Sequence, residues 1–177
     1  MDIEKEVVEE EKPKRFRKYF VLILGVILIL LIVSYYSVSY GVSYILEGLI
    51  QSPSLDEDYG VEFKDFNIIF EKKAYGNLIK IYDENLELEF KACLKGLFVN
   101  NEYTINEIVI PKTYSQKYNQ VIADPCDSNT LISLHSHPFR RCLPSQQDIK
   151  NFKLLKKEND NVLLGIMCEK DRFNFYD

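Results

Sequence analysis

Two histidines and one aspartate are spaced along this chain in a way that suits metal binding. His135 and His137 are the only histidines among the 177 residues, and Asp148 follows them in the next predicted element. Side chains two apart in a strand point to the same face, so both imidazoles would converge while Ile132 and Leu134 face a core. Two imidazoles and a carboxylate suit a catalytic zinc ion, whose fourth tetrahedral position stays open for water.

Other interpretations of these residues remain open at this level. A closed structural zinc site more often uses cysteines, but the four cysteines of this chain form no CxxC pair. Ser145 and Asp148 lie three residues apart ahead of an apolar helix, which is also the pattern of a helix capping box. An H-x-H on a strand can equally be a structural or surface feature. The spacing alone therefore supports both a metal site and a helix cap.

The same residues resemble a known family signature. HSHPFRRCLPSQQD, from His135 to Asp148, is similar to the signature of the JAMM (MPN+) zinc metalloproteases: H-[ST]-H-P, six residues, then S-x-x-D. EFKACLKG, from Glu89 to Gly96, resembles the upstream segment in which that family carries a glutamate seven residues before a glycine. The resemblance implies Zn²⁺ ligands at His135, His137 and Asp148, a general base at Glu89 and an oxyanion-stabilising hydroxyl at Ser145.

The implied chemistry is hydrolysis of an amide bond. Zinc lowers the pKa of a bound water towards about 7 and polarises the scissile carbonyl, so a neighbouring carboxylate can move the proton to the leaving amine. A hydroxyl near the developing oxyanion adds electrostatic stabilisation. Glu87 has the same strand parity as Glu89 and is the fallback base. Ser136 faces away from the histidines and is expected to pack or to support the site.

The elements that must position these residues are predicted from periodicity and turn signals. The histidines lie on a strand at 130–137, and Ser145 caps a helix over 145–157 that carries Ile149, Phe152 and Leu155 on one face. Strands mixed with two helices predict an α/β fold. The resemblance implies more specifically a JAMM-like mixed sheet flanked by helices. The other predicted elements are a strand within 61–70, a helix at 71–84, a hairpin of 88–98 and 103–110 turning at Asn100 and Asn101, a loop at 111–128, and strands at 161–168 and 172–176.

One transmembrane helix is predicted to precede this domain. Residues 19–46 contain no charged side chain, with tyrosines gathered towards the C-terminal part, and about 20 apolar residues suffice to span a bilayer. The preceding tail, 1–18, ends in a basic cluster, and Lys64 is the next cation after Lys18. The positive-inside rule then predicts a cytoplasmic N-terminus and an extracytosolic C-terminal domain. A cleaved signal peptide is the competing interpretation, disfavoured by the long n-region.

The remaining boundaries follow from composition. Residues 47–60 are predicted to be a short polar linker, and 61–177 the JAMM-like domain. Cys93 and Cys168 lie on predicted strands and are interpreted as buried small hydrophobic residues. Cys126 and Cys142 lie in loops flanking the histidine strand and could form a disulfide if the domain is extracytosolic, although sequence does not establish pairing.

These observations predict a membrane-anchored zinc-dependent peptidase or isopeptidase acting on a protein or peptide substrate. Ubiquitin-like conjugates are substrates of the resembled family, but the predicted topology places the domain away from the cytosol. The alternative is a non-catalytic, membrane-tethered MPN-type interaction module. A net charge of -5 disfavours nucleic acid as a partner, and Ser136 departs from the HNHP of RadC-like proteins. A zinc deaminase would need H-x-E and CxxC, and neither occurs.

Overall fold

The computed structural model describes residues 14–39 and 42–177, and the chain divides into a unit ending at Ser43 and a unit from Tyr44 to Asp177. The first unit contains α1 (Lys14–Ser39). Its segment Phe16–Val38 has a mean hydropathy of 2.7 and no burial against the rest of the protein, so it is long and apolar enough to span a membrane. Most of the predicted cytoplasmic tail, residues 1–13, and positions 40–41 lie outside the described residues.

The expected boundary between helix and linker is wrong. Residues 42–46 were grouped with the membrane helix and 47–60 with a polar linker, but Val42–Gln51 form a separate helix, α2. From Tyr44 onward this helix belongs to the second unit, where Gly48 is buried and Arg172 donates to the carbonyls of Leu49 and Ser52. Residues 19–46 contain no charged side chain, so the sequence does not show where α1 ends and α2 begins.

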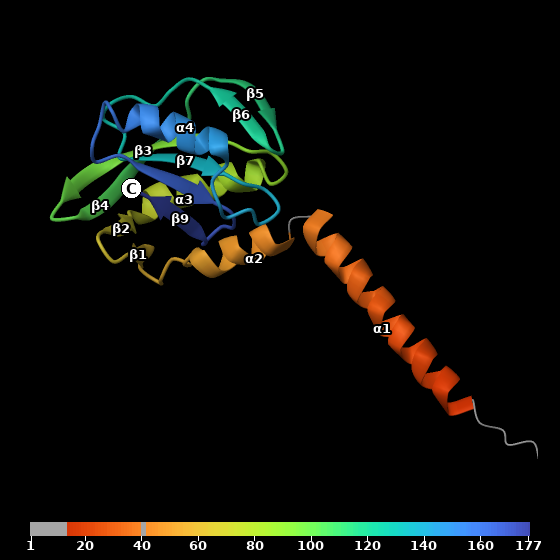
Figure 1. The fold of residues 1–177 in the computed structure, drawn as a ribbon. Coiled ribbons are helices and arrows are strands. Elements are labelled where there is room, and N and C mark those ends of the chain that lie inside the picture. Colours follow the sequence, from red (N-terminus) through yellow and green to blue (C-terminus); the bar gives the residue numbers. More distant parts are fainter. Residues whose placement is uncertain (1–13, 40–41) are drawn as a thin grey trace, which may run out of the picture. The chain divides into compact units, whose positions relative to one another are not determined.

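The second unit is built on one curled, seven-stranded mixed sheet (Figure 1). Its strand order is β1-β2-β4-β3-β7-β8-β9; β2 pairs with β4 and β7 with β8 in parallel, and the other neighbours are antiparallel. The strands are β1 (Gly60–Glu62), β2 (Asn67–Phe70), β3 (Lys91–Val99), β4 (Glu102–Val109), β7 (Ile132–Ser136), β8 (Leu163–Met167) and β9 (Phe173–Tyr176). This confirms the mixed α/β class, with the predicted first strand divided into β1 and β2.

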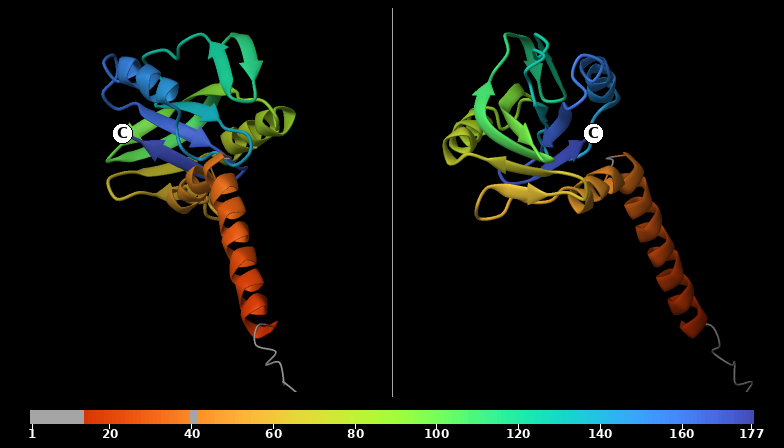
Figure 2. Two further views of the ribbon diagram at one scale, coloured as in Figure 1. Left: turned by 45° about the vertical axis from the view of Figure 1, so that its right-hand side comes forward. Right: turned by 90° about the vertical axis from the view of Figure 1, so that its left-hand side faces the viewer.

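Two helices cover the sheet from opposite sides (Figure 2). α3 (Lys72–Glu84) packs Ala74 and Leu78 into the main core, against fully buried side chains such as Ile132 and Leu134. α4 (Gln146–Leu155) lies over the other face, towards which Ser133 and His135 point by strand alternation. The histidine strand is therefore covered on both faces.

The hairpin β3–β4 depends on residues that the sequence indicated. Asn100 and Asn101 form its turn with φ of 52° and 63°, a left-handed conformation that asparagine tolerates better than most residues. Gly96 lies at a bulge in β3, where an added Cβ would meet the carbonyl oxygen of Thr104 at 1.9 Å. Glycine at position 96 is therefore required by a close backbone approach.

The predicted loop at 111–128 is wrong over most of its length, from Thr113 to Ala123. The strands β5 (Thr113–Lys117) and β6 (Gln120–Ala123) form a separate two-stranded sheet. Tyr114 and Tyr118 are exposed, so this hairpin is held by backbone pairing more than by a buried face, and it shows no alternation of apolar and polar residues.

Cys93 and Cys168 are buried as predicted, but they are disulfide-bonded, and the expected pairing of Cys126 with Cys142 is wrong. Cys93 pairs with Cys126 and Cys142 pairs with Cys168, with Cα–Cα distances of 5.6 and 5.1 Å, and no cysteine is free. Parallel strands β7 and β8 leave the sheet at the same end, with Ser136 opposite Met167, so the loop after His137 runs beside Cys168. On the neighbouring strand, Cys93 lies opposite Ser133, over which the segment containing Cys126 folds back.

Candidate metal centre

His135 and His137 reach the site from the end of the central strand β7. His135 lies between Lys91 of β3 and Ile166 of β8 in the ladder and is 5% exposed. His137 follows the strand, and its backbone N–H donates to the carbonyl of Met167 at 2.8 Å. Its ring Nδ1 lies 3.1 Å from the carbonyl oxygen of Arg141, which leaves Nε2 facing the cluster. A carbonyl that orients a histidine ring in this way is the usual support of a metal-binding imidazole.

Asp148 enters the same space from the first turn of α4. The Ser145 hydroxyl accepts the Asp148 backbone N–H at 3.2 Å, and the Asp148 carboxylate accepts the Ser145 N–H at 2.8 Å. This is a complete capping box, so the cap interpretation is confirmed. The cap also directs the carboxylate inward, where its oxygens lie 3.4 Å from His135 Nδ1 and 3.3 Å from His137 Nε2. The cap and the cluster are thus parts of one arrangement.

Glu89 completes the cluster from the segment just before β3. Its Oε1 lies 3.3 Å from His135 Nδ1 and 3.9 Å from His137 Nε2, and the residue is 6% exposed. The Glu89 N–H donates to Lys117 of β5, and the hydroxyl of Ser136 accepts the N–H of Phe90 at 2.8 Å. Ser136 therefore fixes the backbone that carries Glu89, in agreement with its expected supporting role. Glu87 is exposed and lies outside the cluster.

The electrostatics of the cluster favour the charged form of the Asp148 carboxylate. Burial by itself raises the pKa of Asp148, but the hydrogen bond with His137, the charge of His135 and the cap at Ser145 together hold that pKa well below its usual range. Burial lowers the pKa of His137, yet Asp148 and Glu89 outweigh this and raise it above its usual value. A region that stabilises buried negative charge next to imidazoles can also stabilise a cation.

The donor atoms fit a divalent metal ion by spacing and by charge. Single ligand atoms of Glu89, His137 and Asp148 all lie within 4.8 Å of one another. Zinc–nitrogen and zinc–oxygen bonds of about 2.0–2.1 Å place tetrahedral ligands about 3.3–3.4 Å apart, close to the separations between Asp148 and the two histidines. Two buried carboxylates without a compensating charge are costly, and a dication would balance them. His135 is not one of the three residues of that group. It contacts the cluster through Nδ1, which lies 3.3 Å from Glu89 Oε1 and 3.4 Å from Asp148 Oδ1.

Among the described residues, three hollows border the cluster: one of about 300 Å³ contacts only His135 and Asp148 of the four residues, and the other two contact Glu89. Of these two, one, of about 400 Å³, runs between β6 and the start of α4 and is bounded by Gln120, Gln147 and Asn151. The other, of about 90 Å³, lies on the His137 side and is bounded by Tyr44, Tyr118 and Arg141. Ser145 lines both of the hollows that contact Glu89, and none of the bonds described above uses its hydroxyl hydrogen. A substrate chain in these hollows would run past the cluster.

The residues that form the outer walls of these hollows were not predicted from the sequence. Tyr118, Asn119 and Gln120 come from the hairpin that was predicted to be a loop, and Tyr44 was assigned to the membrane helix. The only available signal was the pair of cations Arg140 and Arg141 within the motif segment between His137 and Ser145.

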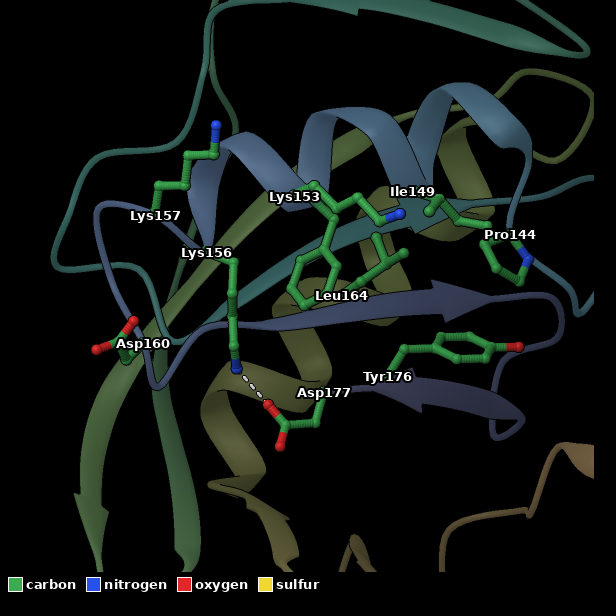
Figure 3. Close-up of a pocket in the computed structure, with 10 residues that line it drawn as sticks. Pro144, Ile149, Lys153, Lys156, Lys157, Asp160, Leu164, Tyr176 and Asp177 are labelled. Atoms are coloured by element: carbon green, nitrogen blue, oxygen red, sulfur yellow. Dashed lines mark hydrogen bonds and ion pairs between the residues drawn. The ribbon is translucent and has the colours of Figure 1, made fainter.

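A larger apolar groove lies between α4 and the strands β8 and β9 and is distinct from the cluster (Figure 3). Its volume is about 600 Å³, and Ile149, Phe152 and Leu164 form its walls, with Lys156 paired to Asp177 at one end. Ile149 was predicted to lie on a packed face but is 39% exposed. Neither histidine lines the groove, so a reaction at the cluster would not take place there.

Comparison with known proteins adds no relative to this picture: no protein-family model matches the chain, and no curated protein matches it.

Proposed function

We propose that this chain is a membrane-anchored, zinc-dependent peptidase or isopeptidase of the JAMM type. The observation that carries the proposal is the convergence of His135, His137 and Asp148 with Glu89 in one buried cluster, on the elements that the motif spacing requires. Each of the four residues is 6% exposed or less. Glu89 and the segment 135–148 are distant in sequence. Their meeting in one cluster is therefore an observation separate from the match of each segment to the motif.

The residues would divide the work as follows. His135, His137 and Asp148 would hold Zn²⁺, which when bound would activate water near neutral pH and polarise a carbonyl. Glu89 belongs to the three-residue group with ligand spacing, but the motif does not use it as a ligand, and it would accept the proton of the attacking water and deliver it to the leaving amine. The Ser145 hydroxyl would donate to the oxyanion that develops on the carbonyl oxygen. The Arg141 carbonyl would keep His137 in one ring orientation.

A purely structural network is the simplest alternative, since the same contacts are also ion pairs. Burying two carboxylates and two imidazoles costs several kcal/mol per ion before pairing, and hydrophobic residues would fill the space at less cost. Groups kept at that cost are typical of functional sites. The arrangement therefore favours a reaction over a passive role.

The same proposal places the domain outside the cytosol. Basic residues precede the apolar helix, and all four cysteines are joined in two disulfides, which persist in oxidising compartments and are rare in the cytosol. The substrates would then be extracytosolic proteins or peptides in preference to cytosolic ubiquitin conjugates.

The test is hydrolysis by the full-length chain in detergent. The purified protein is incubated with a mixed peptide library, cleavage is followed by mass spectrometry, and the zinc content of the same samples is measured. We expect cleavage by the wild type and, for Glu89→Gln, unchanged zinc with a rate about 10²- to 10⁴-fold lower. Cleavage by Glu89→Gln at the wild-type rate would assign the base elsewhere, and zinc-loaded protein without any cleavage would favour the non-catalytic module.

A further inference from the structure

The smallest hollow beside the cluster has features of a specificity pocket, and we call it the Arg141 pocket. It opens on Glu89, His137 and Ser145, so anything bound there lies next to the reacting groups. At about 90 Å³ it holds about three waters by their liquid volume, which limits it to one small residue or side chain. Its other walls are Tyr44, Tyr118, Asn119, Pro138, Arg141 and Leu143.

Arg141 gives this pocket a positive charge without a carboxylate partner. Among residues 14–39 and 42–177, Arg141 forms no ion pair, whereas the adjacent Arg140 pairs with Glu169 at 2.8 Å. The two neighbouring arginines thus have different roles: one is neutralised by a surface pair, and the other lines the pocket. An arginine that faces a pocket without a carboxylate partner is suited to bind an anionic ligand group through two parallel hydrogen bonds.

The backbone of Arg141 is held on both sides. Its carbonyl bonds to the His137 ring, and the next residue, Cys142, is joined to Cys168. On the opposite wall, the Tyr44 hydroxyl donates to the carbonyl of Pro144 at 3.1 Å. Burial, followed by the charge of Asp148, raises the pKa of Tyr44, and Arg141 opposes this, in keeping with a guanidinium close to the phenol. The backbone of the pocket is therefore held in place before any ligand arrives, while Arg141 itself is exposed.

Apart from the proposed zinc ion, the rest of the site offers little positive charge to a substrate carboxylate. Glu89 and Asp148 line the cluster itself, and the larger hollow on the other side has Lys91 as its one cationic lining residue. Lys91 donates to the carbonyl of Asp124, and burial lowers its pKa. A carboxylate next to the scissile bond would therefore find its best side-chain partner in Arg141.

We infer that the Arg141 pocket binds a carboxylate carried by the substrate residue adjacent to the scissile bond. That carboxylate is either the C-terminus of the substrate or an Asp or Glu side chain, and in the first case the protein removes a single terminal residue. The inference deepens the proposed function and rests on it for the identity of the scissile bond. The binding itself does not depend on hydrolysis.

The experiment measures binding with the full-length Glu89→Gln protein in detergent, so that no probe is consumed. Three dansyl-labelled tetrapeptides are compared by fluorescence anisotropy: dansyl-Gly-Gly-Ala-Ala with a free carboxylate, its C-terminal amide, and dansyl-Gly-Gly-Ala-Asp amide. The chain contains no tryptophan, so dansyl emission is read without interference. We expect at least one carboxylate probe to bind roughly 10-fold or more tightly than the neutral amide. Preference for the first identifies a chain terminus, and preference for the third identifies an acidic side chain.

Matched variants separate the pocket from the metal site. Arg141→Gln should abolish the preference while Arg141→Lys retains part of it, and Arg140→Gln, the neighbouring control, should bind all three probes as its parent does. Equal binding of the three probes by the parent protein, or an unchanged preference in Arg141→Gln, overturns the inference. Zinc content is measured for every sample: absence of zinc from the wild-type chain would overturn the proposed function, whereas zinc-loaded protein without a carboxylate preference would overturn the pocket alone.

Discussion

Removing each disulfide in turn should separate the stability of the domain from the organisation of the metal site. The two bridges close loops of similar length, with sequence separations of 33 for Cys93–Cys126 and 26 for Cys142–Cys168. In the chain-entropy model these loops contribute about 3.7 and about 3.5 kcal/mol to the free energy of unfolding. Changing either pair to alanine should therefore lower that free energy by nearly the same amount.

The two pairs should differ in their effect on metal binding. Cys142 lies between His137, whose ring is oriented by the Arg141 carbonyl, and Ser145, which caps the helix of Asp148. In the same loop Phe139 and Arg140 have φ of 61° and 58°, a conformation that costs free energy unless the surroundings hold it. Loss of Cys142–Cys168 releases the support of His137, and loss of such support costs about 10- to 100-fold in metal affinity.

The assay uses the full-length protein in detergent with the Cys93/Cys126→Ala and Cys142/Cys168→Ala double variants. Unfolding by guanidinium, followed by circular dichroism, gives the free energies, and competition with a chelator gives zinc affinity under native conditions. We expect equal destabilisation and a loss of zinc affinity in the second variant only. Equal zinc affinity in both variants, or a greater loss in the Cys93/Cys126 variant, would refute the role given to the loop after His137.

Four further predictions concern single features. His137→Ala should lose bound zinc, measured by metal analysis of the purified protein, and stoichiometric metal in that variant would contradict its assignment as a ligand. Ser145→Ala should lower stability by about 1 kcal/mol through loss of the cap and should also slow hydrolysis, whereas a change in stability alone would reduce Ser145 to a cap. Gly96→Ala should prevent the native β3–β4 pairing because its Cβ would collide with the Thr104 carbonyl, so a native-like unfolding midpoint would contradict that contact. Protease added to intact cells should remove the C-terminal domain, and protection of that domain with cleavage of the N-terminus would reverse the proposed topology.

The convergence of His135, His137 and Asp148 was predictable from the sequence because each of these three residues follows a local rule. Alternation along a strand brought His135 and His137 to the same site, and the S-x-x-D pattern placed Asp148 in the first turn of a capped helix. The structure adds that this cap and the cluster share one carboxylate. Glu89 was found only through resemblance, since an isolated glutamate before a strand has no local signature.

The features that sequence reasoning missed depend on non-local pairing. The disulfides follow from the parallel register of β7 and β8, which brings Cys168 beside the loop of Cys142, and no spacing rule gives that register. The β5–β6 hairpin has exposed tyrosines in place of a buried face, so its periodicity is uninformative. α2 was merged with the membrane helix because the uncharged run continues to Leu46.

The most direct test of the account is the zinc content of the full-length protein, purified in detergent without added chelator, beside the His135/His137→Ala double variant. Both imidazoles point into the one buried cluster, so the account predicts one zinc ion per wild-type chain and none in the double variant, with circular dichroism showing that both are folded. A folded wild-type chain that binds no zinc, or a double variant that binds as much as the wild type, would contradict it.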